Sequence, residues 1–308
     1  MFFLGGFPRE NTPRCVPYVS QDPGLIRLFA HQIRKRMLKG TSLAVEDLGG
    51  GMSNCVPKGG SISVITSTLN ASRTIDDLAR SLVCQTDQDF EWIVCDGGSE
   101  DDTLRIVESY GERLDLIIIL GPGFGIYDAI NRAIAASRFD YYVVVGADDL
   151  LFPTAISDFR AKAPGFDLTA FGVVCGDKLV LPRDDIEIWT DFAAHSVGLV
   201  IRKCLHEKLG FYQQRYAIAA DTLLIRLALR HGASVASHQI VVGCFSLNGI
   251  SSRNYLAAAR ESFKIRIEMG ENRILCYLRL GTGVLKNLGR IVSFELGARG
   301  FFGRRNEN

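Results

Sequence analysis

The stretch FEWIVCDGGSEDDT, at residues 90–103, contains the pattern that decides the predicted fold. Phe90–Cys95 has the composition of a short strand, and Asp96–Ser99 has the residues of a tight turn. Ser99 and Asp102 have the spacing of a capping box, which predicts a helix over 101–110. A strand, a turn and a helix in this order form the repeating unit of parallel sheets.

The same unit recurs on both sides of this stretch. Further strands are predicted at 61–66, 114–120 and 141–145, and further helices at 73–84 and 126–137. Short connections between them predict an α/β fold with a Rossmann-like, mostly parallel central sheet flanked by helices. Ligands of such sheets bind beyond the carboxyl ends of the strands, so Thr66, Asp96 and Asp148 are expected at one edge.

The composition excludes several classes of protein. Of 308 residues, 47% are apolar and 22% are charged, and the net charge of +1 gives no field that would attract nucleic acid. The eight cysteines form no C-x-x-C pair, which favours buried thiols over disulfides or a zinc site. No apolar run reaches the roughly 18 residues that span a bilayer, and the apolar start is too short for a signal peptide. We therefore expect a cytoplasmic protein.

The two ends of the chain differ from the regular middle. Prolines interrupt residues 1–58, where only 25–38 has helical spacing; this basic segment suits either a membrane surface or a solvated extension. Met52 is an alternative start, which leaves open whether residues 1–51 are translated. The expected division is an irregular extension at 1–58, an α/β domain at 59–252 and a helical basic segment at 253–308.

Four segments together identify a resemblance. They are SVITSTLNAS (63–72), QTDQDFEWIVCDGGSEDDT (85–103), GIYDAINRAIAAS (125–137) and GADDL (146–150). In this order and spacing they resemble the family 2 glycosyltransferases, enzymes of the GT-A fold, and the third is similar to the branch that builds bacterial surface polysaccharides. The resemblance covers roughly residues 61–252. It implies an inverting transfer of a sugar from a UDP- or GDP-sugar to a hydroxyl of a glycan or lipid-linked acceptor, in exopolysaccharide, O-antigen or capsule assembly.

The resemblance also implies a metal site. Asp148 matches the family's metal ligand, with Asp149 as an aid, and Mg²⁺ or Mn²⁺ there would neutralise charge on the leaving diphosphate. The family's motif is usually Asp-x-Asp, whereas this chain has Gly146 at the first position, which leaves strict metal dependence open. Taken alone, the Asp pair equally suits a solvated turn.

Further site residues follow from the same matches. Asp96 and Gly97 match the loop that reads the nucleobase, and Thr66 matches a residue near the base, although strand-end threonines are common. Asn70 either contacts the donor or caps the helix from 73. Asp128 and Asn131, near the start of the 126–137 helix, are candidate sugar or ribose contacts; Asp128 also suits the helix dipole.

The second half of the chain supplies the expected base. Asp221 matches the family's catalytic base, which takes the proton of the acceptor hydroxyl, and it equally suits the cap of a helix. His195 matches a family histidine that contacts the diphosphate or metal, or is a structural hydrogen-bonding residue. Ser196 stands where the family usually has Gln.

The basic C-terminal segment has two interpretations. Residues 253–308 contain eleven Lys or Arg against five Asp or Glu, and between Leu278 and Val292 apolar and basic residues are interleaved. Such a segment suits peripheral contact with the anionic inner face of the cell membrane, where lipid-linked acceptors reside. It equally suits a helix that packs on the catalytic domain with its basic side in water.

Three other functions were weighed. A nucleotidylyltransferase normally has a glycine-rich loop after the first strand, and TSTLNASRT (66–74) has no glycine. A dinucleotide oxidoreductase is disfavoured because no G-x-G-x-x-G follows that strand. A non-catalytic nucleotide-sugar binder, decayed from the enzyme, is kept open by Gly146 and Ser196.

Overall fold

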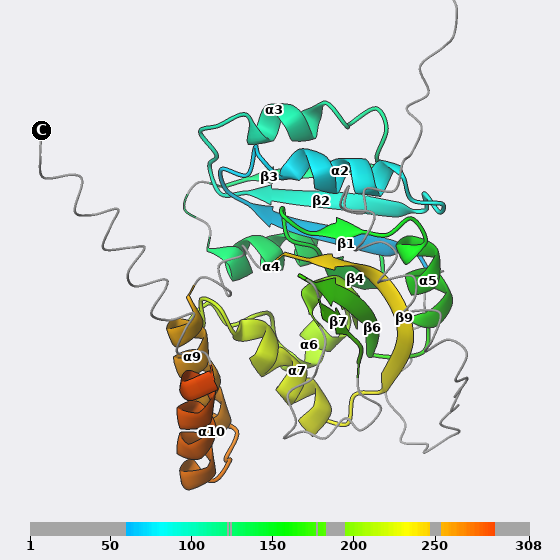
Figure 1. Cartoon of the computed structure of the whole chain (residues 1–308). Coiled ribbons are helices and arrows are strands. Elements are labelled where there is room, and N and C mark those ends of the chain that lie inside the picture. Colours follow the sequence, from blue (N-terminus) through cyan, green and yellow to red (C-terminus); the bar gives the residue numbers. More distant parts are fainter. Residues whose placement is uncertain are drawn as a thin grey trace, which may run out of the picture. The chain divides into compact units, whose positions relative to one another are not determined.

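A computed structural model describes residues 60–121, 123, 125–176, 178–182, 195–246 and 254–286 of the chain (Figure 1). The predicted extension at 1–58, with its 25–38 segment and the alternative start at Met52, lies outside the described residues. The part of segment 253–308 beyond residue 286 lies outside them too.

The described strands form one mixed sheet. Its order is β3-β2-β1-β4-β8-β6-β9-β5, with β7 paired to β6. The strands are β1 (Ile62–Thr68), β2 (Phe90–Asp96), β3 (Leu116–Leu120), β4 (Tyr141–Val144), β5 (Leu150–Leu151), β6 (Leu168–Cys175), β7 (Lys178–Val180), β8 (Leu199–Arg202) and β9 (Val235–Phe245). The first four strands pair in parallel as predicted, and β8 then runs antiparallel to both β4 and β6.

Helices cover both faces of the sheet. They are α2 (Ile75–Val83), α3 (Thr103–Glu108), α4 (Ile126–Ala136), α5 (Ala155–Lys162), α6 (Leu205–Leu209), α7 (Ala220–Arg230), α9 (Tyr255–Glu268) and α10 (Arg273–Lys286), with a 3-10 turn at Ser196–Gly198. Figure 1 shows α2 and α3 on one side of β1 and β2, and α4 on the other. The predicted α/β fold with flanking helices is thus confirmed.

The two faces arise from the two-residue period of the strands. In β1, Ile62 and Val64 pack into the core under α2 and α3, whereas Ile65 packs into the core shared by α4 and α7. In β2, Trp92 lies in the first core and Ile93 in the second. Both faces of these strands are apolar, and both are covered by packed helices. The polar residues expected to form the site therefore lie toward the strand ends and in the loops that follow.

One local prediction was wrong. Ser99 does not cap the helix after β2: α3 begins only at Thr103, and its N-cap Asp102 makes no side-chain capping bond. The Ser99 hydroxyl instead donates to Asp96 Oδ2 at 2.5 Å. The turn residues are used to hold the strand end, which moves the helix start by two residues.

The described part of the C-terminal segment packs on the α/β domain. Ile265 of α9 and Met269, the residue after α9, are buried in the same core as α7. The Glu271 carboxylate, with a side chain 3% exposed, accepts from Arg226 of α7 at 2.7 Å, Arg266 of α9 at 3.1 Å and Arg279 of α10 at 2.9 Å. One buried carboxylate therefore ties three helices together. Among the described residues, no helix is both long and apolar enough to cross a bilayer.

Candidate functional site

The loops after β1 and β2 are joined at the carboxyl edge of the sheet. Thr68, the last residue of β1, is in register with Asp96, the last residue of β2. Asn70 links the loops: its N–H donates to Ser99 Oγ at 2.8 Å, and its Oδ1 accepts from the N–H of Glu100 at 2.9 Å. Asn70 adopts a φ of 52°, which asparagine tolerates better than most residues. Its side chain therefore fixes this edge and does not cap α2.

Asp96 is held by its own turn. The residue is 1% exposed, and its Oδ1 accepts from the N–H groups of Gly98 at 2.9 Å and Ser99 at 2.7 Å. The Ser99 hydroxyl is the third donor, on Oδ2. The N–H of Gly97 donates to the carbonyl of Thr68 at 2.9 Å. Since a carboxylate offers about four lone-pair sites, one site on Asp96 is left for a ligand.

Thr66 and Thr68 differ in what their hydroxyls do. Thr66 is fully buried, and its Oγ1 accepts from Trp92 Nε1 at 3.1 Å, so this side chain serves the core. Thr68 is 4% exposed, and its Oγ1 has no hydrogen-bond partner among the described residues. A buried hydroxyl without a partner is costly unless a ligand supplies one. The sequence analysis missed Thr68 because it ended the strand at residue 66.

The turn after β4 gives the adjacent carboxylates different tasks. Asp149 is 3% exposed, and its oxygens accept from the N–H groups of Gly146 at 2.8 Å and Ser246 at 2.8 Å. Burial raises the pKa of Asp149 to about 6. Asp148 is half-buried, and its side chain makes no hydrogen bond or ion pair with the described residues. Asp149 thus builds the turn, and Asp148 is left for a ligand.

Gly146 is required by this arrangement. A Cβ at position 146 would lie 2.7 Å from Asp149 Oδ2 and 3.1 Å from Asp148 Oδ1. The Asp149 carboxylate occupies the space into which a side chain at 146 would point. The missing first carboxylate of the expected motif therefore has a steric reason in this chain.

His195 lies beside the same turn. Its ring stacks on Phe245 with centroids 4.3 Å apart, and the next residue, Ser246, is the one that bonds to Asp149. Burial lowers the pKa of His195, which favours the neutral imidazole that binds metals. In the described part of the chain no group of three or more His, Cys, Asp or Glu side chains is close enough to hold a metal by itself. The Asp148 carboxylate offers the oxygen ligands that suit a Mg²⁺ or Mn²⁺ ion which takes most of its other ligands from water and phosphate.

The predicted base lies where α4 and α7 meet. Asp221, in the first turn of α7, accepts through Oδ1 from the Thr222 N–H at 2.7 Å and from the Tyr127 hydroxyl at 3.1 Å. Tyr127, in the first turn of α4, shares its single hydroxyl proton between Asp221 Oδ1 and the carbonyl of Ile218, which lies 2.7 Å from the hydroxyl oxygen. Burial raises the pKa of the Asp221 carboxyl. A carboxyl with a raised pKa is a better proton acceptor, so the geometry suits a general base.

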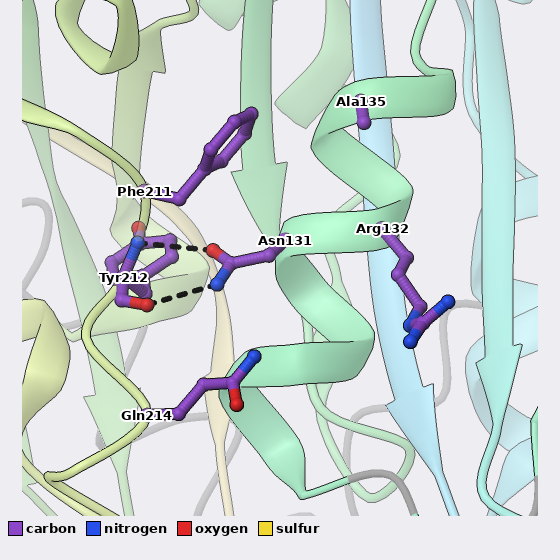
Figure 2. Close-up of a pocket in the computed structure, with 6 residues that line it drawn as sticks. All are labelled: Asn131, Arg132, Ala135, Phe211, Tyr212 and Gln214. Atoms are coloured by element: carbon purple, nitrogen blue, oxygen red, sulfur yellow. Dashed lines mark hydrogen bonds between the residues drawn. The ribbon is translucent and has the colours of Figure 1, made fainter.

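The polar face of α4 is attached to the segment before α7. The Asn131 amide donates to the carbonyl of Tyr212 at 2.9 Å and accepts from its N–H at 3.0 Å, as Figure 2 shows. Asp128 pairs with Arg132 at 3.0 Å and accepts from Gln214 at 2.7 Å. Asp128 and Asn131, the two side chains predicted to contact the sugar, therefore hold Gln214 and Tyr212 in this structure.

A pocket of about 510 Å³ opens between α4 and residues 211–214 (Figure 2). It is lined by Asn131, Arg132, Ala135, Phe211, Tyr212 and Gln214. The Phe211 side chain is 48% exposed and stacks on His206 with ring centroids 5.3 Å apart. The structure therefore places Asn131 at a pocket beside α4, Asp96 at the end of β2, and Asp148 in the turn that follows β4.

Known proteins resemble this chain in sequence. Residues 63–175 match the family model "Glycosyl transferase family 2". A PGL/p-HBAD biosynthesis glycosyltransferase of Mycobacterium bovis is 29% identical over 172 residues, which cover 52% of this chain and 66% of that protein. The chain thus spans just under two thirds of the length of this curated relative.

Solved structures share the fold. A mannosyltransferase of Pyrobaculum calidifontis, in complex with GDP-Man and Mn²⁺, matches with a TM-score of 0.55 and 17% identity over 92% of this chain and 89% of that one. Residues 1–349 of S. aureus TarS, in complex with UDP-GlcNAc, match with a TM-score of 0.52 and 18% identity over 74% of this chain and 73% of that one. At such identities the likeness establishes the GT-A-like fold.

The different tasks of the adjacent carboxylates can be tested by stability. Asp149→Asn should lower the free energy of unfolding by about 1–3 kcal/mol, because an amide can accept from only one of the two N–H donors. Asp148→Asn, the matched control one residue away, should leave stability nearly unchanged. Urea unfolding of both variants measures this, and equal losses would contradict the assignment.

Proposed function

Because residues 63–175 match the glycosyl transferase family 2 model, we propose that the chain is an inverting glycosyltransferase that uses a nucleoside-diphosphate sugar. The observation that carries the proposal is Asp221, a carboxyl with a raised pKa held by Tyr127 at the junction of α4 and α7. A sugar transfer with inversion needs one such base and a site for the leaving diphosphate. The acceptor we propose is a hydroxyl of a surface glycan or of its lipid-linked precursor.

The donor nucleotide would bind at the ends of β1 and β2. Asp96 has one lone-pair site left for a ring N–H of the base, and the Thr68 hydroxyl beside it has no other partner in the described residues. Asn70 and Gly97 would shape this edge through their bonds to the neighbouring loop. We propose a UDP- or GDP-sugar as donor, supported by the UDP-GlcNAc and GDP-Man in the structures with the same fold.

A divalent cation would bind beside this edge. Asp148 would hold Mg²⁺ or Mn²⁺, with His195 near the diphosphate and with Asp149 fixing the turn. When bound, the cation supplies positive charge that stabilises the leaving diphosphate. The Mn²⁺ in the mannosyltransferase of the same fold supports this assignment.

The transfer itself would use Asp221. As the acceptor oxygen forms its bond to the anomeric carbon, Asp221 takes the hydroxyl proton, and the bond to the diphosphate breaks with its electron pair leaving on the diphosphate. Attack on the face opposite the leaving group inverts the anomeric carbon. The Tyr127 hydroxyl orients the carboxylate through its bond to Oδ1.

We also propose peripheral contact between α10 and an anionic bilayer. Ile274, Leu278 and Leu285 follow one another at four- and seven-residue spacing on one helix face, and they are 71%, 61% and 71% exposed. The sequence contains no Asp or Glu from 272 to 294. By helical periodicity Arg273 flanks this apolar face on one side, and Arg279, which is paired with Glu271, flanks it on the other. An exposed apolar face bordered by basic residues suits the surface of an anionic membrane.

The donor site is tested by thermal shift of the full chain with UDP, GDP, CMP and ATP, each with and without Mn²⁺. We expect UDP or GDP to raise the melting temperature with Mn²⁺, and Asp148→Ala to abolish that metal-dependent part. A shift by a diphosphate without Mn²⁺ would remove the cation from the mechanism. No shift with any of these nucleotides would contradict the proposed donor site.

The base is tested by the pH dependence of transfer. Asp221→Asn should lower kcat/KM by about 10²–10⁴-fold and leave the nucleotide-induced thermal shift unchanged. In the wild type, kcat/KM should fall as the pH drops through the raised pKa of Asp221, because the protonated carboxyl accepts no proton. Release of nucleoside diphosphate, followed from pH 4 to 9, measures both. An Asp221→Asn enzyme with full activity would exclude this base.

The membrane contact is tested by sedimentation with vesicles. The full chain should bind vesicles of phosphatidylglycerol and phosphatidylcholine more tightly than phosphatidylcholine alone. Ile274→Glu with Leu278→Glu should weaken binding at least about tenfold. Phe166→Glu, which adds a charge at an exposed apolar side chain of the loop before β6, is the control. Binding that both variants retain, or no binding by the wild type, would exclude this surface.

A further inference from the structure

We propose that Glu261 of α9 is a positioning residue for the Asp221 base. Its Oε1 accepts from the N–H of Ala217 at 3.0 Å, and its Oε2 accepts from the N–H groups of Ile218 and Ala219, each at 2.9 Å. A single carboxylate thus binds three consecutive backbone N–H groups. The inference rests on the proposed function, because Asp221 is the base only in that mechanism.

The three N–H groups belong to the residues that lead into α7. Ala219 is the N-cap of α7, and Ala217 and Ile218 precede it, so the N–H groups of these residues have no partner within the helix and need an external acceptor. The only side-chain acceptor for these three groups in the described residues is the Glu261 carboxylate, which comes from a helix that begins 34 residues after Asp221. A charged acceptor makes shorter and stronger bonds than a neutral one. Glu261 therefore fixes where α7 starts and, with it, the backbone that carries Asp221.

Ile218 connects Glu261 to the catalytic base proposed above, Asp221. Its N–H donates to Glu261, and its carbonyl accepts from the Tyr127 hydroxyl at 2.7 Å. That same hydroxyl lies 3.1 Å from Asp221 Oδ1. The peptide units around Ile218 are thus held on one side by α9 and on the other by α4. A shift of this segment would change the contact between Tyr127 and the base.

Glu261 can hold the segment because α9 is itself fixed. Ile265, one turn further along α9, is fully buried in the core with α7. Beyond the end of α9, Glu271 joins Arg226 of α7 to Arg266 of α9. The half-buried Glu261 side chain therefore projects from a helix anchored over its C-terminal half. Glu268, seven residues later, instead pairs with Arg215 at 2.8 Å and hydrogen-bonds the Tyr216 side chain, and the N–H groups of 217–219 go to Glu261.

The test compares Glu261→Gln with Glu268→Gln. Both replace a carboxylate by an amide on the same side of the same helix. For Glu261→Gln we expect kcat to fall about tenfold to a hundredfold with the donor KM unchanged, the size of effect that a small misplacement of a catalytic group produces. Hydrogen exchange of the amides at 217–219 should become faster. Glu268→Gln should resemble the wild type in each measurement.

A further readout separates this inference from the proposed function. The pKa of the Asp221 carboxyl, followed by carbon NMR during a pH titration, needs no transfer activity. The Tyr127 hydrogen bond lowers the pKa of Asp221, so loosening that contact in Glu261→Gln should raise this pKa further, and Glu268→Gln should not change it. An unchanged pKa together with unchanged exchange at 217–219 would overturn the role of Glu261. A wild type that binds no nucleotide and transfers no sugar would instead overturn the proposed function, whatever the titration gives.

Discussion

Backbone N–H groups in the loops at the carboxyl edge of the sheet need acceptors, and in this protein carboxylates supply them. Loops cannot satisfy these groups through a regular ladder, and leaving them buried and unpaired is costly. Asp96 binds two such groups in its own turn. Asp149 binds one in its own turn and one 97 residues later, and Glu261 binds three before α7. The candidate site is therefore built by carboxylates that organise backbone, with few left over for ligands.

This distinction separates residues that the sequence pattern treats alike. Asp148 and Asp149 are adjacent and chemically identical. Both oxygens of Asp149 accept backbone N–H groups, whereas Asp148 accepts none of these bonds. Thr66 and Thr68 point to the same face of β1, yet one serves Trp92 and the other has no partner in the described part of the chain. The position of each side chain relative to the strand end decides which of the two tasks it performs.

The sequence predicted the parallel half of the sheet because that information is local. Strand and helix periods, and the turn residues after β2, gave boundaries of β1, β2 and α4 within two residues of those observed. The contacts that organise the site depend on distant pairs: Tyr127 meets Asp221 across 94 residues, and Glu261 meets Ile218 across 43. No period in either segment identifies its partner. The roles of Asp96, Asp148, His195 and Asp221 in binding and transfer stay predictions.

The packing of α9 sets a limit on how this protein can be recombined with its relatives. A chimera joined near residue 253, where the charge balance of the sequence changes, would exchange Ile265 and Met269, which are buried against α7, and Glu271, which faces Arg226. Such an exchange replaces two buried core residues and, together with them, three members of the ion-pair cluster, Arg266, Glu271 and Arg279. The segment from residue 253 resembles a separate tail in the sequence. A chimera that exchanges it must therefore also exchange α7, the helix that carries Asp221.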